Sequence, residues 1–135
     1  MSMTKDYFIR ADGSDELACR CGCEKNTFNS ATRWKLNNAR GLAGIPFIIT
    51  SGCRCWSHNA RYDKNGTSSH LCEDENEIPK DSYAFDIKFK NSREKFIIIK
   101  ALIEAGFNRI GINDTLGFIH GDDDPAKAEN VMFKY

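Results

Sequence analysis

The chain has 135 residues, of which 41% are hydrophobic and 28% are charged, enough for one domain with a hydrophobic core and too few for two. Because 19 Lys and Arg balance 19 Asp and Glu, net charge gives no attraction to nucleic acid or to an anionic membrane. The longest apolar run, residues 96–99, is far too short to span a bilayer. We therefore expect one globular domain over residues 1–135, without a nucleic-acid partner or a membrane span.

The chain is expected to begin with an irregular segment followed by a helix. Residues 6–24 contain the turn-forming sequence DGS and no regular apolar pattern. Residues 29–41 carry apolar side chains at helical spacing, and glycines at positions 41 and 44 end the pattern. The side chains expected to face the core are Ala31, Trp34, Leu36, Ala39 and Leu42.

Two short strands are expected next. Residues 46–50, PFIIT, are rich in β-branched residues and end in a Ser-Gly turn, which predicts a buried strand. In residues 83–89, YAFDIKF, apolar and polar side chains alternate, so Phe85 and Ile87 share one face and Asp86 lies on the other. Asp86 should therefore stand on the open face of a sheet.

A second helix and three further strands complete the pattern. Ser92 can cap a helix that runs to about residue 105, where Gly106 ends it. Its expected core-facing side chains are Phe96, Ile99, Leu102 and Ile103. Strands are expected at residues 109–112, 117–120 and 131–134. Since helices precede and separate the strands without strict βαβ alternation, we predict an α+β fold with a mainly antiparallel sheet and two principal helices.

The six cysteines suggest a further feature of the chain. They are Cys19, Cys21, Cys23, Cys53, Cys55 and Cys72. The CxCxC and CxC spacings differ from the CxxC spacing of common zinc knuckles and thioredoxin-like sites. Three interpretations remain open: a second, structural metal, disulfides formed in an oxidising space, or free buried thiols.

The sequence has three histidines, His58, His70 and His120. Two of them together with Asp86 would give a set of two nitrogens and one oxygen that suits catalytic zinc. Such a zinc ion keeps one position open for a water molecule, whose pKa it lowers to roughly 7. Taken one at a time, histidines are more often ordinary, partly buried hydrogen-bonding residues, and we interpret His58 and the adjacent Asn59 as residues that hold a loop together.

Four short segments occur in an order that resembles the zinc D-Ala-D-Ala carboxypeptidase and L-alanoyl-D-glutamate endopeptidase family of peptidoglycan peptidases. They are TSGCRCWSHN at residues 50–59, SH at residues 69–70, AFDI at residues 84–87 and FIHGD at residues 118–122. The resemblance covers about residues 8–122. It implies that His70, Asp86 and His120 bind Zn²⁺ on the open face of the sheet. It also implies that Arg54 lies beside the zinc ion, where a guanidinium can hold a polarised carbonyl or an oxyanion.

Two more residues and one segment take expected roles from this resemblance. Ser69 would support its loop or contact the substrate, and Trp56 would face the substrate or lie in the core. The family has a short loop between the first histidine and the aspartate, whereas residues 71–85 separate them here. The acidic stretch at residues 72–81 would loop out at the rim of the site, either to select or shield the substrate or as a solvated loop without a function.

The general base departs from the family pattern. Related enzymes carry a Glu three positions before, or a His two positions before, the last zinc ligand, and these positions are Gly117 and Phe118 here. Asp122 completes an HxD pattern that resembles a phage and bacterial branch of the family, and in a strand it would face the same side as His120. We interpret Asp122 as the base or as a residue that supports His120; the alternative is a solvated carboxylate in the run at residues 122–124.

The resemblance implies a zinc metallopeptidase that cuts peptidoglycan stem peptides at either the D-Ala-D-Ala or the L-Ala-D-Glu bond, such as a phage endolysin. The first ten residues, MSMTKDYFIR, lack the apolar region of a secretory signal. We therefore expect a monomer made in the cytoplasm that acts at the cell wall after release or phage delivery. Two alternatives are a catalytically inactive zinc-containing module that binds the cell wall or a protein, and a cysteine-rich structural metal protein.

Overall fold

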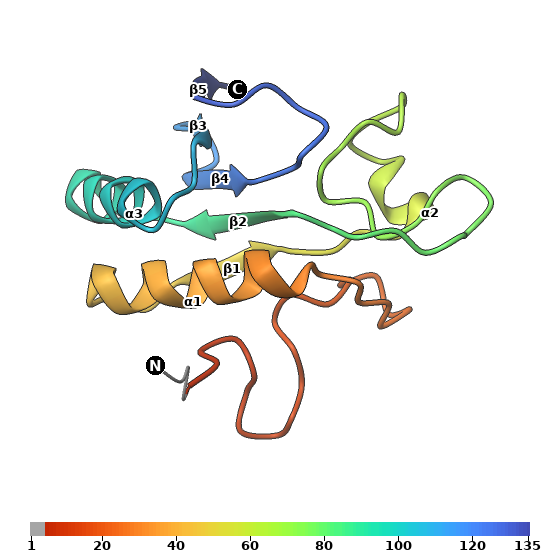
Figure 1. Cartoon of the computed structure of the whole chain (residues 1–135), viewed down its shortest axis with the longest axis horizontal. Coiled ribbons are helices and arrows are strands. Elements are labelled where there is room, and N and C mark those ends of the chain that lie inside the picture. Colours follow the sequence, from red (N-terminus) through yellow and green to blue (C-terminus); the bar gives the residue numbers. More distant parts are fainter. Residues whose placement is uncertain (1–4) are drawn as a thin grey trace.

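The computed structural model describes residues 5–135, and within them the chain forms three α-helices and one five-stranded sheet (Figure 1). Along the chain these are α1 (Ser30–Ala43), β1 (Ile48–Ser51), α2 (Trp56–Asn59), β2 (Ala84–Lys88), α3 (Ser92–Glu104), β3 (Arg109–Asn113), β4 (Phe118–Asp122) and β5 (Val131–Lys134). The strand order is β1-β2-β4-β3-β5, and every pair is antiparallel except β3 and β5. The predicted α+β class with a mainly antiparallel sheet is confirmed.

Residues 1–4 lie outside the described residues. They are the start of the ten-residue stretch in which the sequence predicts no secretory signal. No helix in residues 5–135 is long and apolar enough to cross a membrane.

Alternation along β2 separates the core from the open face of the sheet. Phe85 and Ile87 are fully buried in the core, to which α1 and α3 contribute Leu36 and Leu102. Asp86 lies between them in the sequence but outside the core cluster, and it lines a cavity that neither Phe85 nor Ile87 reaches, so it projects from the other face. The predicted orientation of this strand is therefore confirmed.

The α1 helix begins after Asn29, whose side chain accepts a hydrogen bond from the backbone N–H of Thr32. Its buried positions are Thr32, Leu36, Asn37 and Ala39. The prediction that Ala31 and Leu42 face the core is wrong, since both are exposed. Part of the buried face is polar because the N-terminal segment lies on it, where Asn37 accepts a hydrogen bond of 2.7 Å from the backbone N–H of Tyr7.

The α3 helix is capped by Asn91, which accepts a hydrogen bond from the backbone N–H of Glu94, and not by Ser92 as predicted. Its buried positions are Ile98, Ala101 and Leu102. The prediction that Phe96 and Ile103 face the core is wrong, because their side chains are 66% and 51% exposed. Apolar residues surround much of this helix, so helical spacing left more than one candidate stripe, and packing against α1 and β4 selected one.

The long connection between β1 and β2 extends beyond the sheet at the end where β1 finishes and β2 begins (Figure 1). It contains α2, a single helical turn, and returns to the sheet just before Ala84. Side chains from this connection can therefore reach the open face at the end of the central strands.

Candidate metal centre

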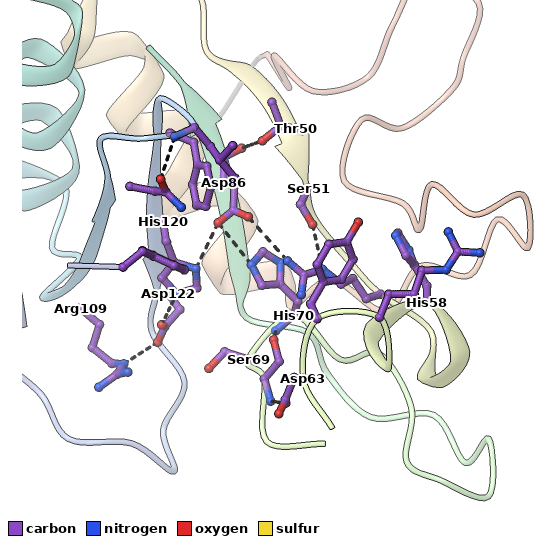
Figure 2. Close-up of a pocket in the computed structure, with 18 of the residues that line it drawn as sticks. Thr50, Ser51, His58, Asp63, Ser69, His70, Asp86, Arg109, His120 and Asp122 are labelled. Carbon is purple, nitrogen blue, oxygen red and sulfur yellow. Dashed lines mark hydrogen bonds and ion pairs between the residues drawn. The ribbon is translucent and has the colours of Figure 1, made fainter. Parts of the chain in front are cut away.

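The sheet register places two of the predicted ligands side by side. Asp86 of β2 and His120 of β4 are direct cross-strand partners, so their side chains project from the same face. In β1 the register shifts between Ile49 and Ser51, and this bulge brings Ser51 opposite Asp86. Figure 2 shows the side chains of His70, Asp86 and His120 pointing toward one another.

His70 reaches this face from the connection between β1 and β2. Its backbone carbonyl accepts hydrogen bonds from the backbone N–H of Arg54 and from the hydroxyl of Ser82, at 2.8 and 2.9 Å. Its Nδ1 lies 2.7 Å from the carbonyl oxygen of Gly52. Since a carbonyl oxygen only accepts, Nδ1 carries the proton and Nε2 is left with a free lone pair.

That lone pair has no hydrogen-bond partner within the protein. Among buried side-chain nitrogen and oxygen atoms of residues 5–135, Nε2 of His70 is the one that lacks a partner. It lies 3.3 Å from Oδ1 of Asp86, outside hydrogen-bonding geometry. A buried acceptor without a donor is costly, and a cation is the partner that would satisfy it together with the carboxylate.

The spacing of the three ligand atoms fits zinc. Two ligand atoms that are each about 2.1 Å from a tetrahedral zinc ion are roughly 3.4 Å apart. Oδ1 of Asp86 lies 3.3 Å from Nε2 of His70 and 3.1 Å from Nδ1 of His120, and the group fits within 4.8 Å. The residues present therefore fit a zinc ion with one position left for another ligand.

Charges within the group also suit a cation. Burial lowers the pKa of His70, and Asp86 offsets this only in part, so its imidazole is neutral at pH 7. Burial would raise the pKa of Asp86, yet His70 and His120 hold it well below its usual range, so the carboxylate is ionised. Burial lowers the pKa of His120, but hydrogen bonds to Asp122 and Asp86 outweigh it and raise that pKa. A divalent ion would displace the Nδ1 proton that His120 shares with Asp86.

Asp122 lies on the far side of His120 from Asp86. Its Oδ2 is 2.7 Å from Nε2 of His120, while its Oδ1 accepts hydrogen bonds from Nε of Arg109 and the backbone N–H of Asp124, at 2.8 and 3.1 Å. The side chain is 1% exposed. Burial would raise the pKa of Asp122, but these partners, His120 first, keep it below its usual value. Figure 2 shows the contact with Arg109.

An aromatic side chain packs beside His120. His120 pairs with Gly111 of β3, and Gly111 pairs with Phe133 of β5. A Cβ atom on Gly111 would lie 2.4 Å from Cε2 of Phe133. Glycine therefore leaves space for the Phe133 ring, whose centroid lies 5.7 Å from that of the His120 imidazole. The Phe133 ring helps to bury this imidazole.

Arg54 is held in place by several partners. Its Nε donates to Oγ of Ser51 at 3.1 Å and its Nη1 donates to Oδ1 of the buried Asn59 at 3.2 Å. The guanidinium carbon lies 4.6 Å from the centre of the Tyr62 ring. Nη2 is 3.7 Å from Oδ2 of Asp86. The structure thus brings Arg54 to the edge of the three-residue group.

A cavity of about 1060 Å³ opens beside these residues and carries basic side chains. The basic residues that line it are Arg20, Arg54, Arg61, Arg109 and Lys127. Ser69 also lines it, and its hydroxyl donates a hydrogen bond of 2.8 Å to Oδ2 of Asp124. Trp56 is not among the described residues that line the cavity. Its indole packs on the turn at Gly66 instead, where a Cβ atom on the glycine would lie 2.3 Å from Cη2 of Trp56.

The acidic stretch at residues 72–81 does not lie at the rim of the cavity, in contrast to the prediction, and within residues 5–135 none of its members lines the cavity. It packs instead against the N-terminal segment. Glu73 is buried, accepts a hydrogen bond of 2.7 Å from Nζ of Lys25 and accepts another of 2.9 Å from the backbone N–H of Trp56. Thr27 donates to the carbonyl of Cys72 at 3.2 Å.

Sequence reasoning missed Arg109 and the backbone of Gly52. Arg109 was predicted only as the start of a strand, and its role as the partner of Asp122 depends on the pairing of β3 with β4. Gly52 was seen only as part of a turn, although its carbonyl selects the tautomer of His70. A local sequence pattern carries no signal for either contact.

Comparison with known proteins gave one match. A family model described as Peptidase M15 matches residues 13–122, which contain His70, Asp86, His120 and Arg54. The comparison with curated proteins and the comparison with solved structures found no match.

Proposed function

The chain belongs to the peptidase M15 family, whose members are zinc metallopeptidases, and we propose that it hydrolyses a peptide bond in peptidoglycan stem peptides. The bond is either D-Ala-D-Ala or L-Ala-D-Glu. The observation that carries the proposal is the buried, partnerless Nε2 of His70, which faces Asp86 and His120 beside a cavity. Family membership supports action on peptidoglycan.

His70, Asp86 and His120 would hold the zinc ion. When bound, zinc supplies a Lewis acid that polarises a carbonyl and makes a water molecule acidic enough to ionise near neutral pH. Arg54 is oriented by Ser51 and Asn59, so its guanidinium can donate hydrogen bonds to the oxygen on which negative charge develops. Because these two hydrogen bonds already fix the Arg54 side chain, it loses less conformational entropy when it binds this oxygen.

The basic side chains of the cavity suit a substrate rich in carboxylates. Stem peptides carry the side-chain or main-chain carboxylate of D-Glu and a C-terminal carboxylate. Arg20, Arg61 and Lys127 lie on the lining and would pair with these groups. Ser69 lines the same cavity and remains our proposed substrate contact, whereas the position of Trp56 favours a role in packing.

We assign Asp122 to positioning His120. Its ionised carboxylate accepts a hydrogen bond from Nε2–H of His120, which turns Nδ1 toward Asp86 and raises the basicity of Nδ1. Arg109 and the backbone N–H of Asp124 occupy its other oxygen. Of the two roles expected for Asp122, these contacts favour support of His120 over that of general base.

The proposed substrate lies outside the cytoplasm. The protein would therefore act at the cell wall after release or phage delivery, as a phage endolysin does, and we propose that it acts as a monomer. The site of action follows from the proposed substrate class.

The test combines zinc content with cleavage of purified muropeptides followed by mass spectrometry. Wild type should cut muropeptides, and His70→Ala and Asp86→Asn should each contain one zinc ion fewer per chain and show no cleavage. The matched control is Asp114→Asn, the same chemical change on an exposed turn where Asp114 pairs with Lys95. It should keep both zinc content and activity.

A second candidate function is a zinc-containing module that binds stem peptides without cutting them. It is favoured by Gly117 and Phe118, which stand where related enzymes carry the base, and by the fully engaged carboxylate of Asp122. Zinc that is lost in His70→Ala, together with muropeptide binding but no cleavage by wild type, would reject the peptidase and support this module.

A further inference from the structure

Four cysteines that are well separated from His70, Asp86 and His120 in the sequence meet at a second place. Cys19, Cys21 and Cys23 come from the N-terminal segment, and Cys55 is the residue that precedes α2. Their four sulfur atoms lie within 4.8 Å of one another, and all four are free thiols. Nothing in the proposed peptidase reaction uses them.

We propose that Cys19, Cys21, Cys23 and Cys55 bind one zinc ion in a closed, structural site. Four thiolates at about 2.3 Å from a tetrahedral zinc ion are roughly 3.8 Å apart. The sulfur of Cys21 lies 3.6 Å from that of Cys19 and 3.5 Å from that of Cys55. A span of this size holds a single ion, and an all-sulfur tetrahedral set is a preferred environment of zinc.

Two backbone N–H groups donate hydrogen bonds to sulfur atoms of the cluster. The backbone N–H of Cys55 donates to Sγ of Cys19 at 3.3 Å, and that of Lys25 donates to Sγ of Cys23 at 3.5 Å. His58 places Nδ1 3.3 Å from Sγ of Cys19. Hydrogen bonds from such donors to the ligand sulfurs orient them and offset their negative charge.

Burial of small apolar side chains does not explain the cluster. Cys21 and Cys23 are exposed, in contrast to Cys53 and Cys72, which are buried and lie outside the four-sulfur group. Glu24, which follows Cys23, also has a φ of 60°, in the left-handed region that is unfavourable for a residue other than glycine. A ligand common to the four sulfurs accounts for both observations.

A disulfide accounts for the geometry less well. The sulfur of Cys21 is almost equally close to the sulfurs of Cys19 and Cys55. One disulfide joins one pair and leaves the other contact unused, whereas a metal ion uses all contacts at once. Cross-linking within CxC also closes a very short loop, which constrains the unfolded chain little.

The proposed ion would fasten the N-terminal segment to the part of the chain that positions Arg54. Cys55 follows Arg54 directly and precedes α2, whose Asn59 accepts a hydrogen bond from Arg54. His58 of the same helix contacts Cys19. The second site therefore supports the loop at the edge of the first, although the two ions are bound by separate residues.

The first test counts zinc in the full-length protein purified without chelators. Wild type should contain two zinc ions per chain, Cys21→Ser one, and His70→Ala one. The matched control, Cys72→Ala, removes a buried thiol outside the cluster and should keep two. One zinc ion in wild type that is kept in Cys21→Ser and lost in His70→Ala, or two zinc ions in a folded Cys21→Ser, would overturn the proposal.

A second measurement does not depend on the folding of a cysteine variant. Wild type loaded with Co²⁺ in place of zinc should show the intense sulfur-to-cobalt charge-transfer absorption that nitrogen and oxygen ligands do not give. This absorption should persist in His70→Ala and therefore distinguishes failure of the second site from failure of the peptidase site. A cobalt-loaded wild type without the band would overturn the proposal.

Discussion

Asp122 is buried and makes contacts with both of its oxygens, so a single substitution at this position changes several groups. Without the negative charge of Asp122, the hydrogen bond that holds the Nε2 proton of His120 is weaker, and Arg109 loses an ion-pair partner. His120 would then be free to rotate or to change tautomer. Asp122 is not one of the proposed zinc ligands, but through His120 it is expected to control how tightly zinc is bound.

We predict that Asp122→Asn weakens zinc binding at the His70 site by about 10- to 100-fold, the range found when such hydrogen-bond partners of metal ligands are lost. Competition with a chelator of known affinity measures the effect. Asp123→Asn is the matched control, because Asp123 is a neighbouring carboxylate that bonds Thr32 and Lys35 instead of a histidine. Unchanged zinc affinity together with lost turnover would assign Asp122 to proton transfer instead.

At the scale of elements, Gly52 joins three parts of the fold. Its carbonyl oxygen accepts a hydrogen bond from Nδ1–H of His70, and it lies where the end of β1 touches the N-terminal segment. The next residue, Cys53, donates its backbone N–H to the carbonyl of Leu17 at 2.8 Å. A Cβ atom on Gly52 would lie 2.5 Å from that same carbonyl oxygen. Only glycine permits this approach of the two backbones.

We predict that Gly52→Ala lowers the unfolding free energy by about 1–3 kcal/mol, the usual cost of forcing extra atoms into a packed site, and reduces zinc retention by displacing the acceptor of His70. Thermal or denaturant unfolding and zinc content measure the two effects. Gly41→Ala is the control, since this glycine is helical, exposed and free of close neighbours. It should raise stability by about 0.5–1 kcal/mol, and an equal gain at position 52 would contradict the packing argument.

At the scale of the whole molecule, the N-terminal segment and the long β1–β2 connection pack on each other through a buried charge. Glu73 contacts Lys25, which lies 48 positions earlier in the sequence. Burial would raise the pKa of Glu73, but the hydrogen bond from Lys25 and that from the backbone of Trp56 keep it below its usual value. The ionised carboxylate therefore helps to hold two distant segments together.

This contact predicts a pH dependence. Because folding lowers the pKa of Glu73, its stabilising effect is fully present above the pKa of an unfolded glutamate, about 4.3, and is lost as pH falls through the lower folded value. Wild type should be more stable than Glu73→Gln at pH 7, and the difference should shrink below about pH 4. Denaturant unfolding across pH measures it.

The control for this prediction is Glu75→Gln, which changes an exposed glutamate of the same stretch. It should match wild type at both pH values. A difference between wild type and Glu73→Gln that stays constant as pH falls would show that shape, and not ionisation, makes position 73 important.

Some features of the site could be predicted from the sequence because they depend on residues that are close together along the chain. Strand alternation put Asp86 on the face opposite Phe85 and Ile87, and the structure confirms it, because Phe85 and Ile87 belong to the core cluster and Asp86 lines the cavity. The order of four motifs suggested that His70 and His120 join Asp86, and the structure brings the three within 4.8 Å. That they bind zinc in this chain stays a prediction.

Other features depended on partners that the local sequence does not specify. The core face of α3 was misjudged at Phe96 and Ile103, because its apolar residues fit several stripes and contact with α1 chose among them. The acidic stretch at residues 72–81 was placed at the rim of the site, although its buried Glu73 pairs with Lys25. In each case a contact between distant segments decided the outcome.

By itself, the sequence determined the class of the fold, the alternation of β2, the family and a short set of candidate ligands, because periodicity, turn residues and motif order act over a few neighbouring positions. The tertiary structure alone decided that Asp122 meets Arg109, that Gly52 sets the tautomer of His70, and that four cysteine sulfurs converge. The physical reason is that hydrogen bonds and metal sites require atoms a few ångströms apart. Such distances between remote residues are set by strand register and packing.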